Sequence, residues 1–88
     1  GTFVFDCRIA GFDSVTPSSA GFTIVGSTRT TGAAAVLLGG QAVDSFDEAA
    51  TTTASGALVV SGNSAIFRVT GVAGLTINWN AVMTYTFV

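Results

Sequence analysis

Strict alternation of apolar and polar positions dominates the last fourteen residues, LTINWNAVMTYTFV. Side chains in a β-strand point to opposite faces with a period of two, so the pattern predicts a strand with one buried, aromatic face. That face carries Leu75, Ile77, Trp79, Ala81, Met83, Tyr85 and Phe87. An unbent strand of this length would span about 45 Å. We therefore expect it to bend across two sheets or to pack partly on another chain.

Shorter apolar runs, separated by Gly, Ser, Thr and Pro, predict five further strands. They cover residues 2–12, 21–28, about 33–39, 56–60 and 64–70. The first of them alternates, with an inner face formed by Phe3, Phe5, Cys7 and Ile9. The run at 33–39 has apolar residues at both odd and even positions, and thus on both faces of a strand. We therefore expect it to be buried on both sides.

Turn residues between these strands suggest how they connect. Residues 29–32, RTTG, predict a hairpin turn with Gly32 at positive φ, and residues 61–63 predict another tight turn. Gly26 interrupts the second strand at an expected bulge. The C-terminal half then forms a three-stranded antiparallel meander, and the N-terminal half another. The fold class is all-β: a single domain over residues 1–88, a small antiparallel β-sandwich or jelly-roll-like domain of about six strands.

Composition adds a requirement for partners. Hydrophobic residues make up 49% of the chain and charged residues 9%, with a net charge of −2, whereas soluble domains usually have about 25% charged residues. A small domain cannot cover its surface with so few charges, so we expect copies of the chain to cover part of it. The three arginines are spread out and cannot form a nucleic-acid surface. The longest apolar run, AAAVLLGG, is too short for membrane insertion.

The sequence offers little for catalysis. Histidine and lysine are absent, which excludes a Ser-His-Asp site and the commonest metal ligand. Carboxylates remain: Asp44, Asp47 and Glu48 could hold Ca²⁺, although their spacing matches no known loop. A glycosidase-like pair would need Asp6 or Asp13 beside that cluster, across a groove that so small a domain rarely builds. We predict no catalytic residues, no cofactor and no metal.

Two local interactions are also expected. Asp6 and Arg8 share one face of the first strand, and Arg68 lies on the outward face of the strand at 64–70. This arrangement favours a cross-strand ion pair or a ring of such pairs across an oligomer axis. Residues 41–55 form either a loop over the sheet or one helical turn with a capping box of Ser45 and Glu48.

Two residues are expected in the core, and three others are candidate binding residues. Cys7 lies among inward apolar positions, where a free thiol behaves as a small hydrophobe. Trp79 shares its face with aliphatic neighbours, which favours a core position over a sugar-stacking platform. Asn78 and Asn80 flank it on the opposite face. Together with Arg29, these two asparagines are the candidate contacts for a partner.

The C-terminal stretch FRVTGVAGLTINWNAVMTYTFV resembles the closing hairpin of many phage virion proteins, in which a strand ending in V-T-G, a Gly turn and a strand with T-I-x-W finish the chain. The opening strand TFVFDCRIAGF and the hairpin GSTRTTGAAAVLLGG fit the same pattern. The resemblance implies an all-β module on the particle surface, in a tail fibre or spike tip or as a capsid decoration or head-fibre protein, commonly a trimer. It supplies no catalytic residues, and Asn80 stands where the usual Arg follows the Trp motif.

The resulting hypothesis is a non-enzymatic virion structural protein, a homotrimer that binds itself and then other virion proteins or a host-surface receptor. One alternative is a bacterial fimbrial or surface subunit, although such subunits usually carry a disulfide and this chain has one cysteine. The other alternative is a small carbohydrate-binding β-sandwich, which requires an exposed Trp79.

Overall fold

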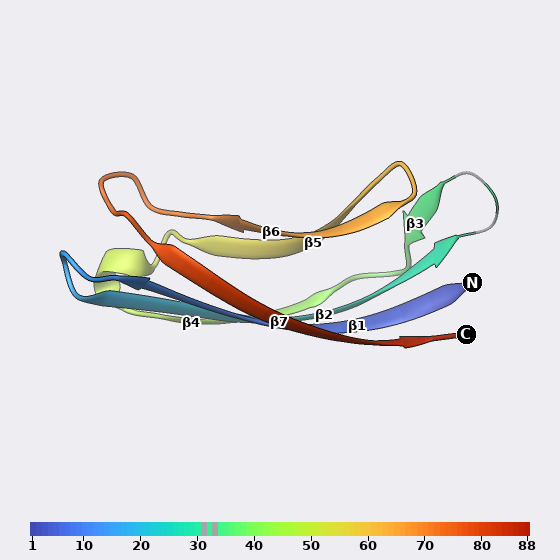
Figure 1. Ribbon diagram of the computed structural model, residues 1–88, viewed down its shortest axis with the longest axis horizontal. Coiled ribbons are helices and arrows are strands. Elements are labelled where there is room, and N and C mark those ends of the chain that lie inside the picture. Colours follow the sequence, from blue (N-terminus) through green and yellow to red (C-terminus); the bar gives the residue numbers. More distant parts are fainter. Residues whose placement is uncertain (31, 33) are drawn as a thin grey trace.

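Two antiparallel sheets, packed one on the other, form the part of the chain described by the computed structural model, residues 1–30, 32 and 34–88. Figure 1 shows the two-stranded sheet lying over the middle of the larger one, with both chain termini at one end. Seven strands lie in this part of the chain, one more than expected. The all-β sandwich predicted from the sequence is confirmed.

The larger sheet has five strands, in the order β3-β2-β1-β7, with β4 also paired to β2. They are β1 (Thr2–Asp13), β2 (Ser18–Thr30), β3 (Ala35–Leu37), β4 (Ala42–Asp47) and β7 (Asn78–Phe87). The smaller sheet is the hairpin of β5 (Ser55–Ser61) and β6 (Ser64–Thr70). Its turn lies where the sequence predicts it, with Gly62 at φ +57°.

Alternation builds the core between the sheets. On β1, Phe5, Cys7 and Ile9 are buried as predicted, and they face the smaller sheet. Antiparallel register sets Ile9 opposite Phe22 and Cys7 opposite Ile24 of β2, so both strands direct their apolar residues to this inner face. Facing them, the smaller sheet contributes mainly Leu58 of β5. The opposite face of the larger sheet, here called the outer face, is open to solvent.

Gly26 does not form the predicted bulge. Its register is continuous, opposite Phe5. A Cβ added at Gly26 would lie 2.5 Å from Leu58 Cδ2, so the glycine lets the second sheet approach closely. Gln41 adds a further tie, since its side chain accepts from Leu58 N at 2.6 Å and donates to Leu58 O at 2.7 Å.

The predicted C-terminal meander is wrong. β5 and β6 pair as expected, but β7 leaves them and pairs with β1 in the other sheet. This register sets Phe87 opposite Phe3 and Tyr85 opposite Phe5. The aromatic faces of the first and last strands thus lie side by side, and residues 71–77 carry the chain between the sheets.

The third predicted strand is also wrong in extent and burial. β3 covers Ala35–Leu37, and Val36 is exposed. Its predicted start at residue 33, and residue 31 within the predicted turn 29–32, lie outside the described residues. Gly32 has the expected positive φ, +93°.

Residues 41–55 contain a strand that the sequence analysis did not predict. β4 pairs with β2, and Ser45 lies within it, so Ser45 does not cap a helix. A 3₁₀ turn, η1 (Ala49–Thr51), begins after Glu48 instead. The buried Thr51 donates from Oγ1 to Ser19 O at 2.7 Å, and the Glu48 carboxylate accepts from Ser19 N at 3.0 Å. These bonds fasten η1 to the start of β2.

Candidate functional site

One edge of the larger sheet is β7, and it is free of any further strand in the described part of the chain. In the described part of the chain it pairs with β1 alone, from Phe87 opposite Phe3 to Asn78 opposite Phe12. Between Asn78 and Phe87 the sequence has no charge and no proline, and the register with β1 is continuous. Charges, prolines and bulges are the usual features that keep an edge strand from pairing with another chain. β7 is therefore an unprotected edge ten residues long.

Large apolar side chains of β7 are exposed on both faces. Val82 is 65% exposed on the outer face, and Met83, Tyr85 and Phe87 are 45%, 60% and 57% exposed on the inner face. The sequence predicts that the aromatic, inner face of this strand is buried, and that prediction is wrong for its second half, Met83 to Phe87. The smaller sheet has two strands, and β5 lies against β2 and β3, so among the described strands none is packed over this end of β7.

The other half of the predicted aromatic face is partly covered. Leu75 and Ile77 are half-buried just before β7, and Trp79 is half-buried within it. The Trp79 ring stacks on Phe22 with centroids 6.0 Å apart, and a Cβ on Gly11 would lie 2.5 Å from the indole. The indole thus packs on the margin of the core, in agreement with the prediction.

Backbone hydrogen bonds show which residues of β7 face the free edge. Thr2 and Val88 exchange both of their bonds, at 2.8 and 2.9 Å. Because alternate residues of an antiparallel strand bond to the same side, even-numbered residues of β7 bond to β1. The odd-numbered residues direct their N–H and C=O groups away from the sheet. These are Trp79, Ala81, Met83, Tyr85 and Phe87.

An aromatic cluster marks the open end of the sandwich. The ring of Phe3 lies 4.4 Å from that of Phe87 and 5.5 Å from that of Phe5, measured between centroids. Beside it, between the sheets, is a groove of about 220 Å³ lined by Phe3, Phe5, Thr28, Thr30, Ala35, Asn63, Ala65 and Met83. The groove has no charged lining residue, so it offers apolar contact rather than chemistry.

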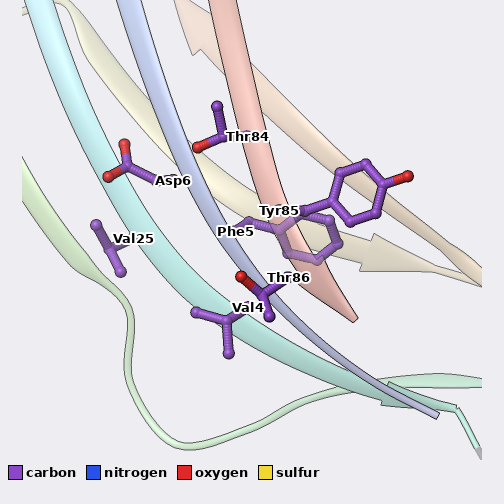
Figure 2. Close-up of a pocket in the computed structure, with 7 residues that line it drawn as sticks. All are labelled: Val4, Phe5, Asp6, Val25, Thr84, Tyr85 and Thr86. Atoms are coloured by element: carbon purple, nitrogen blue, oxygen red, sulfur yellow. The ribbon is translucent and has the colours of Figure 1, made fainter. Parts of the chain in front are cut away.

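A second hollow of about 220 Å³ lies on the outer face and is drawn in Figure 2. Its lining residues are Val4, Phe5, Asp6, Val25, Thr84, Tyr85 and Thr86. Figure 2 shows the rings of Phe5 and Tyr85 directed away from the Asp6 carboxylate. Arg8 Nε lies 4.0 Å from Asp6 Oδ1, an exposed contact along one strand rather than the predicted cross-strand pair, and such pairs stabilise little.

The three predicted contact residues lie at two ends of the outer face. Asn78 and Asn80 are exposed on β7, opposite Phe12 and Ala10 of β1. Arg29 is exposed on β2, opposite Thr2 of β1. It therefore lies eight to ten residues along β1 from the two asparagines, which is about 26–33 Å in an extended strand. The structure therefore brings the two asparagines together and leaves Arg29 apart. Sequence reasoning did not name Val82 as a contact residue, because its place on a free edge follows only from the pairing of β7 with β1.

The acidic residues do not converge. Asp44 and Asp47 are three positions apart on β4, which directs them to opposite faces. The Glu48 carboxylate is hydrogen-bonded to Ser19 N. Among the residues that the structure describes, no three His, Cys, Asp or Glu side chains are grouped to hold a metal ion.

Asp13, the other candidate acid, closes the turn between β1 and β2. Its carboxylate accepts from Val15 N at 2.8 Å, from Thr16 N at 3.4 Å and from Thr16 Oγ1 at 3.2 Å. The bond from Val15 N, more than any other, holds the pKa of the Asp13 carboxyl below its ordinary value, against the opposing effect of burial. A carboxyl held ionised in this way is a structural group and a poor proton donor.

Cys7 is buried in the core, as predicted, with 1% of its surface exposed. Burial, with a smaller contribution from the charge of Asp6, raises the pKa of the Cys7 thiol. The thiolate is the reactive form of cysteine. Cys7 is therefore a packing residue.

Comparison with known proteins finds no matching family model, no matching curated protein and no matching solved structure. Within the described residues, no helix has the length and apolar character needed to cross a membrane.

Proposed function

We propose that this chain is a non-enzymatic structural protein of a bacteriophage particle, which acts by binding copies of itself and then other virion proteins or a host-surface receptor. The observation that carries the proposal is the edge strand β7, which is uncharged and exposes Val82, Met83, Tyr85 and Phe87. Exposed apolar patches and unprotected edges are typical of surfaces that partners cover.

A role in binding rather than catalysis also agrees with the arrangement of polar groups. The chain has no histidine or lysine, Asp13 is occupied by turn hydrogen bonds, and Asp44 and Asp47 point to opposite faces. The assignment to a phage particle is supported by the resemblance of residues 67–88 and of the opening strands to virion proteins. The homotrimer implied by that resemblance remains a prediction, and a twofold pair would also cover β7.

The two alternatives fit less well. A carbohydrate-binding site needs a free indole face, and Trp79 instead stacks on Phe22 beside Gly11. A fimbrial subunit would take a strand donated by a neighbour, and such subunits usually carry a disulfide, whereas this chain has one cysteine. Such a subunit needs the donated strand to associate, so the isolated chain of 88 residues would stay monomeric.

Light scattering coupled to size-exclusion chromatography tests the proposal. The 8.8 kDa chain is expected to elute at micromolar concentration with the mass of two or more copies. A monodisperse monomer at that concentration would overturn self-association and favour the fimbrial alternative. Electron microscopy of the parent particle, which counts and locates the copies, tests the assignment to a virion.

A further inference from the structure

We propose that β7 pairs antiparallel with β7 of a second copy across a twofold axis at Val82, so that two five-stranded sheets join into one continuous sheet. The proposal rests on the self-association put forward above and specifies its geometry. The observation that carries the proposal is that β7 is an unprotected edge strand whose backbone and side chains are complementary to those of a second, antiparallel copy.

The two sides of the larger sheet differ in how they end. On the side away from β7, the sheet ends in the three residues of β3 and in β4, which carries Asp44 and Asp47. Short edge strands and charges are the usual barriers to pairing. β7 has ten residues and no charge. Its own copy is therefore a better match for β7 than the acidic β4 of a neighbour, which would also build an open filament rather than a closed pair.

The backbone of β7 fits this pairing. A twofold axis at Val82 sets Met83 opposite Ala81 of the partner subunit, and Tyr85 opposite the partner's Trp79. All of these are odd-numbered residues, whose N–H and C=O groups face the free edge. Each would donate one hydrogen bond and accept one, as in any antiparallel pair. Val82 bonds to β1, so the two copies of Val82 would form a close pair without hydrogen bonds between them.

The side chains fit the same register. On the inner face, Tyr85 and Met83 would meet the partner's Trp79 and Ala81, all of them apolar or aromatic. On the outer face, Val82 would meet Val82 of the partner subunit, and Thr84 would meet the partner's Asn80. A slip by one residue would set Tyr85 against Asn80 and mix the two faces. Asn80, a contact residue predicted from the sequence, thereby lies in the interface.

A glutamate at position 82 tests the axis. Val82 lies opposite Arg8 on β1, so Val82→Glu gains an attractive neighbour within its own subunit and should fold. In the pair, two glutamates would face each other with Cα atoms about 4.5 Å apart. We expect the dimer dissociation constant to rise at least roughly tenfold, which corresponds to about 1.4 kcal/mol.

Val36→Glu is the matched control. Val36 is exposed on β3, at the edge of the sheet away from β7. It lies opposite Arg29 of β2, just as Val82 lies opposite Arg8 of β1. We expect its dissociation constant to remain within about twofold of the parent value, since surface changes away from an interface usually have small effects. Equal weakening by both substitutions would overturn the proposed axis.

A cysteine at position 82 provides an independent readout. Cα separations of about 4.5 Å in such a pair lie within the range that a disulfide can bridge. Val82→Cys should form a covalent dimer on mild oxidation, seen on a non-reducing gel, whereas Val36→Cys and the parent chain with its buried Cys7 should not.

Three outcomes separate the geometry from the proposed function. A monomeric parent chain would overturn both. An oligomer that withstands Val82→Glu and does not cross-link through Val82→Cys would overturn the twofold pairing and leave self-association standing. A monodisperse trimer would also overturn the pairing, since a twofold contact closes after two copies.

Discussion

Gly11 on β1 gives the indole of Trp79 its place against the inner face of the sheet. A Cβ at Gly11 would lie 2.5 Å from the ring, well inside van der Waals contact. Gly21 on β2, opposite Ala10, faces outward, and a Cβ there would make ordinary contacts at 3.6 Å and beyond. Packing requires glycine at the first position and not at the second.

We therefore expect Gly11→Ala to lower the free energy of unfolding by about 1–3 kcal/mol, because the indole must shift out of its packing. Gly21→Ala is the control and should change it by no more than about 0.5 kcal/mol. Urea unfolding followed by Trp79 fluorescence measures both. Equal effects would show that the indole does not rest on Gly11.

The lowered pKa of the Asp13 carboxyl implies that the stability of the fold depends on pH. The pKa of Asp13 is lowered in the folded chain, so its contribution to stability is present above the ordinary carboxyl pKa of about 3.9. That contribution is lost as the pH falls through the lower folded pKa. Asp13→Asn keeps an oxygen that accepts from Val15 N but cannot titrate. Thermal melts from pH 7 down to pH 2 should show a smaller acid-induced decrease in Tm for Asp13→Asn than for the parent chain.

At the scale of strands, alternation predicted the elements whose two faces differ. β1 and β6 have nearly their expected bounds, 2–12 and 64–70, because exposed residues alternate with buried ones along β1 and with half-buried ones along β6. The predictions for β3 and β4 failed because both strands are short and each pairs with only a part of β2. Such short strands are extended because they pair with β2, and their own residues show little alternation of apolar and polar side chains.

The partner of β7 could not be predicted from alternation either. Its pattern gives a strand with an aromatic face, but not the sheet to which it belongs. The excessive length of the alternating segment was the available signal, since it already implied packing on another sheet or chain. The free edge itself, and thus the exposure of Val82, depends on the pairing with β1.

Leu58 of β5 is the most deeply buried residue that the two-stranded sheet packs against the larger sheet. Its side chain is buried above Gly26. We expect Leu58→Ala to lower the free energy of unfolding by about 2–5 kcal/mol, a large share of the 5–15 kcal/mol typical of domains. Ile66→Ala on β6, where the side chain is exposed, should cost less than about 1 kcal/mol. Chemical denaturation compares the two variants.

At the scale of the whole molecule, the pairing of β1 with β7 joins the two strands of the larger sheet that are farthest apart in the sequence. The chain measures 46 × 20 × 19 Å, and its first and last strands run side by side, with Thr2 bonded to Val88. The other pairs of the larger sheet join β1 to β2, β2 to β3 and β2 to β4, strands at most two elements apart. The pairing of β1 with β7 closes a loop through almost the entire chain, and such non-local contacts slow folding.

A circular permutant tests this. Joining residue 88 to residue 1 by a short Gly linker, and opening the chain between Ala73 and Gly74, makes β7 and β1 a hairpin and breaks no other strand pair. We expect this permutant to refold faster than the parent chain in stopped-flow experiments that follow Trp79 fluorescence. A permutant opened between Gly62 and Asn63 is the control, because it separates β5 from β6 and should gain less. Equal rates for the parent chain and the first permutant would contradict the prediction.

The late arrival of β7 also matters during synthesis on the ribosome. Until β7 emerges, the aromatic side of β1 has no strand beside it, and Phe3 and Phe5 lack the rings of Phe87 and Tyr85. An unpaired strand edge beside exposed aromatic rings favours aggregation of the nascent chain. Pairing of β7 covers that edge and in the same step creates a new one, so the edge proposed for self-association exists only once the larger sheet contains all five of its strands.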